Sequence, residues 1–81
     1  MSYFVYVLKS ESYQTRYVGC AEDVSRRIEE HNAGRCRYTK GRRPWRLIHQ
    51  EEFRTHSEAR KREYFLKSGV GRQELDKILS R

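Results

Sequence analysis

The feature that most constrains the fold of this chain is the run YFVYVLKS at residues 3–10, which is apolar on both of its alternating faces. Its aromatic and β-branched side chains favour a strand over a helix. A strand with two apolar faces is covered on both sides, which is typical of a central strand. We therefore expect residues 3–10 to form the central strand of a sheet.

Two further strands are expected. The polar connection at residues 11–16 is short enough for a hairpin, so YVGC at residues 17–20 predicts a second, short strand. Gly19 within it marks a bulge or a close approach by another group. The stretch WRLIHQEEF at residues 45–53 predicts the third strand.

The first helix is expected from Val24 to about Asn32. Asp23 before it is a suitable N-cap, and NAG after it, ending at Gly34, is a stop signal. Residues 24, 27, 28 and 31 form the stripe of this helix that should face inward.

The second helix is expected to begin after Thr55, because Thr55 and Glu58 have the spacing of a capping box. We expect it to end near Ser68, where GVG at residues 69–71 breaks the pattern. RQELDKILS at residues 72–80 then predicts a short last helix. Its packing side chains are expected to be Leu75, Ile78 and Leu79.

These elements predict one domain over residues 1–81, in the order β-β-α-β-α-α. The economical fold class is α/β (α+β), with a three-stranded antiparallel sheet flanked by helices. Only 36% of the residues are apolar and the mean hydropathy is −1.06, so the core is thin. A charged side chain on an inward-facing helix stripe is costly in such a core, and its presence is therefore informative.

Both long helices carry such side chains. Arg27 and His31 occupy the inward stripe of the first helix, and Glu63 lies beside the inward stripe of the second. One interpretation is a structural ion pair between Arg27 and Glu63. That interpretation leaves His31 unexplained, as well as Tyr6 and Tyr17 in the strands just upstream.

The same side chains suit phosphodiester hydrolysis. That reaction requires a base that activates water, a cation that stabilises the phosphate, and a metal held by a carboxylate. A lone carboxylate such as Glu63 favours Mg²⁺, with Mn²⁺ as a substitute, because Mg²⁺ keeps most of its waters. Tyr6 is the first candidate for activating water, with Tyr17 positioning the phosphate or sharing that role. Arg27 stabilises phosphate charge and should lower the pKa of the phenol.

The net charge of +7 favours a polyanionic partner such as nucleic acid, with a merely solvated basic surface as an equal alternative. A basic loop precedes the third strand and suits a groove that follows a phosphate backbone. The candidate binding residues in this loop are Arg37, Lys40, Arg42 and Arg43. Gly19 in the second expected strand is a further candidate. Trp45 at the end of this loop is expected to anchor the third strand rather than to contact bases.

The sequence has no run of membrane-spanning length, and we expect no membrane partner. Cys20 and Cys36 have no metal-binding spacing, which makes a zinc site improbable. Free thiols in a reducing cytoplasm are the simplest interpretation, and a disulfide between them is left open.

The order of several short motifs resembles the GIY-YIG nuclease domain. FVY at residues 4–6 and YVG at residues 17–19 are followed by an arginine with a histidine four residues later, and then by a glutamate near FLK. YTKGRRPWRL at residues 38–47 and SEARKREYFLKS at residues 57–68 are similar to the small, stand-alone bacterial branch of that family. The resemblance covers nearly the whole chain.

This resemblance implies roles for the matching residues. The matches are Tyr6, Tyr17, Gly19, Arg27, His31 and Glu63. By resemblance Arg27 is the catalytic arginine, Glu63 binds the metal, and His31 falls on an active-site position of more variable role. A hydrogen-bonded histidine at a helix end is an equal alternative for His31. An asparagine that larger family members carry after the glutamate helix has no counterpart in GVGRQEL.

The function expected is a metal-dependent endonuclease that acts on DNA and selects its substrate by structure rather than by sequence. Branched or single-stranded DNA is the expected substrate form, with a protein partner as a further source of specificity. The alternative is a non-catalytic module that binds DNA or RNA on the same fold.

The hairpin register tests the shared site. In an antiparallel pair of strands, the residue numbers of any two opposed residues add up to the same total, and opposed residues lie on the same face of the sheet. Tyr6 and Tyr17 therefore share a face if that total is odd, as it is when Tyr6 opposes Gly19. We expect both hydroxyls to open onto one cleft with Arg27 and Glu63. We also expect Gly19 to lack a side chain so that substrate or the first helix can approach.

Overall fold

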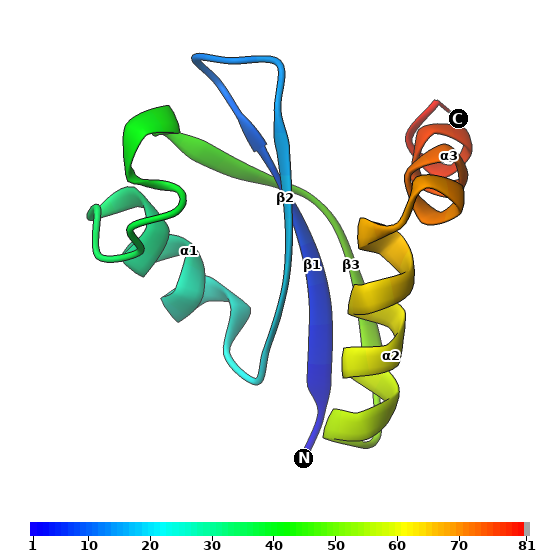
Figure 1. Cartoon of the computed structure of the whole chain (residues 1–81). Coiled ribbons are helices and arrows are strands. Elements are labelled where there is room, and N and C mark those ends of the chain that lie inside the picture. The colour runs from blue at the N-terminus through cyan, green and yellow to red at the C-terminus, as the bar shows by residue number, and fades with distance from the viewer. Residues whose placement is uncertain (81) are drawn as a thin grey trace.

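The computed structural model describes residues 1–80 and places the sheet between two helical layers (Figure 1). The sheet has the order β2-β1-β3 and both of its pairings are antiparallel. The strands are β1 (Tyr3–Ser10), β2 (Arg16–Ala21) and β3 (Trp45–Phe53). The predicted central position of the first strand and the element order β-β-α-β-α-α are thus confirmed.

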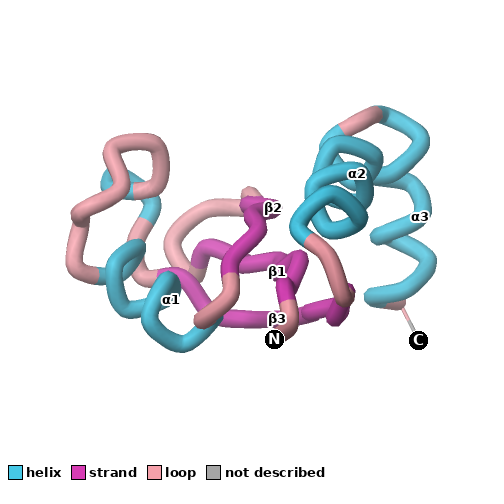
Figure 2. The backbone as a smooth tube through the Cα atoms, turned by 90° about the horizontal axis from the view of Figure 1, so that it is seen from below, coloured by secondary structure: helices cyan, strands magenta, loops and turns pink. Residues whose placement is uncertain are grey.

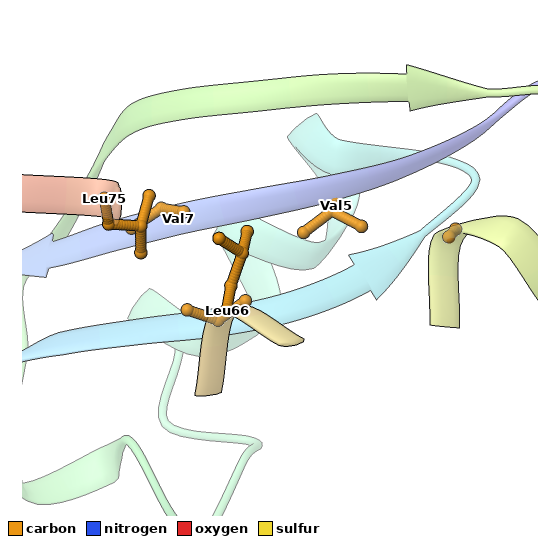
Figure 3. Packing of buried hydrophobic residues seen from close by; sticks show 6 residues of the cluster. Val5, Val7, Leu66 and Leu75 are labelled. Carbon is orange, nitrogen blue, oxygen red and sulfur yellow. The ribbon is translucent and has the colours of Figure 1, made fainter. Parts of the chain in front are cut away.

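The two faces of β1 pack against different helices. In Figure 2 the sheet lies between α1 (Val24–Asn32) on one side and α2 (His56–Lys67) with α3 (Gly69–Leu79) on the other. Val5 and Val7 point toward α2 and α3, where Leu66 and Leu75 complete a buried cluster (Figure 3). The intervening residues of β1 face the opposite way and pack with residues such as Val24 and Trp45. This alternation explains why the strand is apolar on both faces.

Helix α1 begins and ends as expected. The side chain of Asp23 accepts a hydrogen bond from the backbone N–H of Arg26 at 3.1 Å, which caps the helix. Gly34 lies just after the helix with φ of +81°, a backbone conformation that glycine adopts without strain.

The boundary between α2 and α3 differs from the prediction. The expected capping box at Thr55 and Glu58 is present, but GVG lies inside the first turn of α3 rather than between the helices. Ser68 alone separates the two helices, and its hydroxyl accepts from the backbone N–H of Gly71 at 3.1 Å. A Cβ atom at Gly71 would lie 1.8 Å from the carbonyl oxygen of Phe65, so this glycine permits close helix packing rather than a break.

The last helix also buries less than predicted. Of its three expected packing side chains, Leu75 is buried, whereas Ile78 and Leu79 stay partly exposed. None of the helices within residues 1–80 is long and apolar enough to cross a membrane.

The sheet irregularity is not at Gly19. The β1–β2 pairing runs without interruption from Phe4–Ala21 to Lys9–Arg16, so the suggested bulge there is wrong. The register shifts instead between β1 and β3, where Val7 opposes His49 and the next residue opposes Leu47. The expected basic loop contains one short 3₁₀ turn, η1 (Lys40–Arg42).

Candidate active site

The β1–β2 register brings the two tyrosines of the predicted site onto one face of the sheet. Tyr6 opposes Gly19 and Tyr17 opposes Leu8, so the sum of opposed residue numbers is odd, as the shared-site hypothesis requires. The two phenol rings lie with their centroids 6.3 Å apart, on the side that α1 covers. The predicted juxtaposition of Tyr6 and Tyr17 is confirmed.

Gly19 is required by Tyr6 and not by a substrate. A Cβ atom at position 19 would lie 2.4 Å from the hydroxyl oxygen of Tyr6, closer than real Cβ contacts. The tyrosine ring therefore crosses the strand over this glycine. The expectation that Gly19 leaves room for substrate or for α1 is wrong, because the neighbouring strand fills that space.

Tyr6 begins a buried chain of hydrogen bonds. Its hydroxyl lies 3.0 Å from Nε2 of His31, and Nδ1 of His31 lies 2.8 Å from the hydroxyl of Thr39. The side chains at positions 6, 31 and 39 are at most 1% exposed. Thr39 is held in turn, since the indole N–H of Trp45 donates to its carbonyl oxygen at 2.9 Å. The predicted anchoring role of Trp45 is confirmed.

The direction of these hydrogen bonds follows from Thr39. Its hydroxyl donates to the carbonyl oxygen of Cys36 at 3.4 Å, so it can accept from Nδ1 of a neutral His31. Nε2 of that tautomer is an acceptor, and the Tyr6 hydroxyl therefore donates to it. The arrangement leaves the ring of His31 ready to take a proton from Tyr6.

The pKa values of Tyr6 and His31 favour the state in which both side chains are neutral. Burial raises the pKa of Tyr6 to about 12, against the opposing effect of the nearby Arg27 guanidinium. Burial, and then the positive charge of Arg27, lower the pKa of His31 below its usual value. Arg27 lowers the pKa of the phenol as expected, but desolvation is the larger effect and the net shift is upward.

Arg27 does not pair with Glu63. Its guanidinium, which is partly exposed, donates to the carboxylate of Glu30 at 2.7 Å, three residues along α1. The structural Arg27–Glu63 ion pair considered from the sequence is therefore wrong. Arg27 remains beside the Tyr6 hydroxyl. Burial raises the pKa of Tyr17, and the nearby Arg27 guanidinium opposes that rise only in part.

Glu63 lies on the other helical layer, at the edge of the sheet that β2 forms. Its Oε2 accepts from Lys67 at 2.9 Å, and the Lys67 ammonium lies 5.8 Å from the centroid of the Tyr17 ring. Burial first, and then the Glu63 carboxylate, raise the pKa of the Cys20 thiol on β2. Tyr17 and Glu63 thus approach each other around the edge strand, with Lys67 between them.

The four predicted residues do not open onto one cleft. Tyr6 is 1% exposed and its hydroxyl is occupied by His31, whereas Tyr17 is half-buried and lines a surface groove. Glu63 is only 7% exposed. The shared-cleft expectation is therefore wrong for Tyr6 and Glu63, although the residues still form one connected cluster.

Glu63 is also the best-placed metal ligand. No group of three or more His, Cys, Asp and Glu side chains within residues 1–80 could hold a metal ion. The Oε1 atom of Glu63, however, is buried and has no hydrogen-bond partner among those residues; a guanidinium nitrogen of Arg60 lies 3.8 Å from it. An unsatisfied carboxylate oxygen fits a single protein ligand to a largely hydrated divalent cation.

The other predicted binding residues are exposed in the loop after α1. Ser10 and Ser12 in the β1–β2 hairpin donate to the carbonyl oxygens of Arg42 and Arg43, at 2.7 Å and 2.9 Å. These bonds fix the path of the loop and leave its guanidinium groups at the surface. The exposed cations are Arg37, Lys40, Arg42 and Arg43.

Thr39 is the residue of the cluster that the sequence did not reveal. It sits in a basic loop without apolar periodicity, and a threonine among arginines has no distinguishing pattern. Only its place in YTKGRRPWRL, the stretch similar to other family members, could have drawn attention to it.

The chain is similar to known proteins over almost its full length. The family model described as the GIY-YIG catalytic domain matches residues 2–76. The UPF0213 proteins of Staphylococcus aureus strains Mu3 and COL are each 46% identical to the chain over 81 residues, covering 99% of it and 98% of their own length. The solution structure of the UPF0213 protein BH0048 from Bacillus halodurans is similar with a TM-score of 0.58 and 34% identity, covering 96% of this chain and 85% of that one. With a catalytic-domain match over almost its full length and the paired tyrosines in register, the chain belongs to the GIY-YIG family.

Proposed function

We propose that this protein is a metal-dependent endonuclease that hydrolyses phosphodiester bonds in DNA. GIY-YIG domains are generally nucleases, and they generally use divalent metals. The observation that carries the proposal is the hydrogen bond from Tyr6 to His31, beside Arg27 and Tyr17. The phenol, the imidazole and the guanidinium lie together in an arrangement that suits proton transfer beside a phosphate.

In the proposed reaction Tyr6 takes a proton from the attacking water while its own proton passes to Nε2 of His31. Because the pKa of Tyr6 is raised and that of His31 is lowered, this proton rests on Tyr6 in the free protein. The anionic phosphate of a bound substrate favours the imidazolium and draws the proton across. Arg27 stabilises the charge that develops on the phosphate oxygens.

Tyr17 and Glu63 complete the proposed site from the edge strand. Tyr17 faces the surface groove and is placed to position the scissile phosphate. Glu63 would hold a divalent cation at Oε1, Mg²⁺ with Mn²⁺ as a substitute, and the cation would supply Lewis-acid stabilisation of the phosphate. Lys67 already holds the other oxygen of this carboxylate and so fixes its orientation.

A non-catalytic nucleic-acid-binding module is the second candidate. The observation that favours it is the low exposure of Glu63, whose carboxylate is flanked by Lys67 and Arg60. If these cations keep metal away, the domain retains its basic surface without cleaving its ligand.

One assay separates the two candidates. Supercoiled plasmid, a branched DNA, a linear duplex and a matched RNA are incubated with the protein in Mg²⁺, in Mn²⁺ and in EDTA, and nicking is followed on gels. We expect metal-dependent nicking of DNA, with the branched substrate cut faster than linear duplex. Binding in EDTA without cleavage under any metal condition would establish the non-catalytic alternative.

A further inference from the structure

A groove of about 680 Å³ runs beside the proposed active site, and the proposed reaction uses two of its lining residues, Tyr17 and Lys67. It lies along β2, between the loop that follows α1 and the region where α2 meets α3. In Figure 2 that loop and α2 stand on either side of β2. Its volume falls within the range of about 300–1,000 Å³ that small-molecule sites occupy.

The groove has an apolar floor and an aromatic wall. Val18, Leu66 and Leu75 contribute the floor, and the rings of Tyr17 and Tyr38 lie with their centroids 6.0 Å apart. Tyr38 is 76% exposed, so its ring presents an open face next to the floor. A ring held at the mouth of an apolar groove is a platform on which a flat heterocycle can stack.

The rim of the groove is positively charged. Arg16, Lys67 and Arg72 line it, and no acidic side chain does. Arg16 is paired with Asp76 at 2.8 Å and Lys67 with Glu63 at 2.9 Å. Arg72 forms no ion pair within residues 1–80, which leaves its guanidinium available for an anion.

We propose that this groove binds one unpaired nucleotide of the DNA substrate, with its base stacked on Tyr38 and its phosphate held by Arg72. The proposal rests on the proposed nuclease function and specifies its substrate as a strand with an unpaired base beside the cleaved bond. A base inside a duplex cannot offer its face to Tyr38, because both of its faces are stacked on neighbouring bases. Tyr17 lines both the groove and the catalytic cluster, so the stacked base lies next to the proposed site of cleavage.

Binding can be measured without cleavage. Fluorescence anisotropy in EDTA follows a labelled oligothymidylate of about twelve nucleotides, an abasic strand of equal length and a blunt duplex. We expect the oligothymidylate to bind at least five times more tightly than the abasic strand. Tyr38→Leu should weaken oligothymidylate binding about tenfold and leave abasic binding unchanged, because only stacking is lost.

Two control variants isolate the groove. Tyr64→Leu removes a similarly exposed tyrosine on α2 that does not line the groove, and it should leave the preference for bases intact. Arg72→Gln should weaken binding of both strands and reduce its salt dependence, more than Arg54→Gln does at an exposed position outside the groove. Thermal melts of each variant establish that the fold is kept.

The outcomes separate this proposal from the proposed function. Equal affinity for the oligothymidylate and the abasic strand, or equal losses in Tyr38→Leu and Tyr64→Leu, would overturn the nucleotide site even if the wild-type protein nicks DNA. If the base preference depends on Tyr38 but the protein shows no metal-dependent nicking, the nucleotide site in the groove is supported and the nuclease function is overturned.

Discussion

The hydroxyl of Tyr6 and Nε2 of His31 lie 3.0 Å apart, and both side chains are almost fully buried. One residue belongs to the central strand and the other to the last turn of α1, so their hydrogen bond fastens the helix to the sheet. The same bond joins a phenol to its proton acceptor. Structure and chemistry therefore depend on one contact, and the two contributions can be separated experimentally.

Replacing either Tyr6 or His31 alone should destabilise the fold, and replacing the second residue as well should restore part of the lost stability. Tyr6→Phe and His31→Leu each leave a buried polar group unsatisfied, which costs about 1–3 kcal/mol. The double variant removes both the phenol oxygen and the imidazole, while the Thr39 hydroxyl keeps its bond to the carbonyl oxygen of Cys36. We therefore expect the loss in the free energy of unfolding to be smaller than the sum of the single losses. Urea unfolding of all four proteins measures this coupling. Strictly additive losses would show that the two side chains do not interact.

The lowered pKa of His31 predicts a loss of stability in acid. Because the folded state disfavours the imidazolium, the unfolded chain binds more protons below the usual pKa of 6.5, and stability rises with pH through that region. The contribution is complete above 6.5 and is lost as pH falls through the folded pKa. We expect urea unfolding at about pH 7.5 and about pH 5 to give a smaller difference for His31→Leu than for the wild type.

The control for this pH effect is His56→Gln, because His56 is exposed. It should keep the wild-type difference between the two pH values. An unchanged difference in His31→Leu would place the acid sensitivity elsewhere in the chain.

Gly19→Ala should displace Tyr6. The added methyl group would lie 2.4 Å from the phenol oxygen, and the buried ring has no free space into which it can move. We expect a loss of about 1–3 kcal/mol in the free energy of unfolding, together with loss of nicking. Gly41→Ala is the matched control, since nothing lies within 4 Å of its added Cβ atom. Equal melting temperatures for the two variants would contradict the close approach.

Much of the fold could be predicted because its determinants are local. Residues 3–10 are apolar on both faces, and they form the central strand between two helical layers. The capping box of Thr55 and Glu58 begins α2 where expected, and Gly34 follows α1 with a positive φ. Each of these signals lies within a few neighbouring residues, where sequence spacing and spatial distance agree.

The errors concern relations between elements. Gly71 reads as a helix breaker, yet its missing side chain lets α3 pack against the carbonyl oxygen of Phe65. Gly19 suggests space for a ligand, but Tyr6 of the adjacent strand occupies it. The inward positions of Arg27 and Glu63 suggest an ion pair, although the sheet separates their helices. The spacing of residues along one helix predicts which face of that helix a side chain occupies. It does not predict which residue of another element the side chain meets across the core.

The basic loop predicts binding that depends on salt more than on sequence. Arg42 and Arg43 are exposed beside the site, so replacing both with Glu should weaken DNA binding in parallel for unrelated sequences. The slope of log affinity against log salt should fall, and residual nicking should persist at high protein concentration. Anisotropy titrations over a range of salt concentrations measure both effects. Strong base selectivity that survives high salt would be incompatible with backbone binding.

Glu63→Gln should abolish metal-dependent nicking while leaving the fold nearly unchanged. The substitution is almost isosteric and removes the charge at Oε1, the one buried side-chain oxygen in the cluster without a hydrogen-bond partner within residues 1–80. Its partner Lys67 is 44% exposed, so the freed ammonium is solvated and the lost ion pair should cost about 1 kcal/mol. A nicking assay beside a thermal melt tests both parts.

Glu29→Gln removes an equal charge from an exposed position on α1 and should nick DNA like the wild type. If Glu63→Gln instead melts far below the wild type but keeps its specific activity, Glu63 supports the fold and the metal must bind elsewhere. If it is stable and inactive, and if Mn²⁺ concentrations that saturate the wild type fail to rescue it, the carboxylate supplies the metal ligand. The orphaned oxygen of Glu63 then has its explanation, because a buried carboxylate oxygen with no protein partner is satisfied by the cation that the reaction requires.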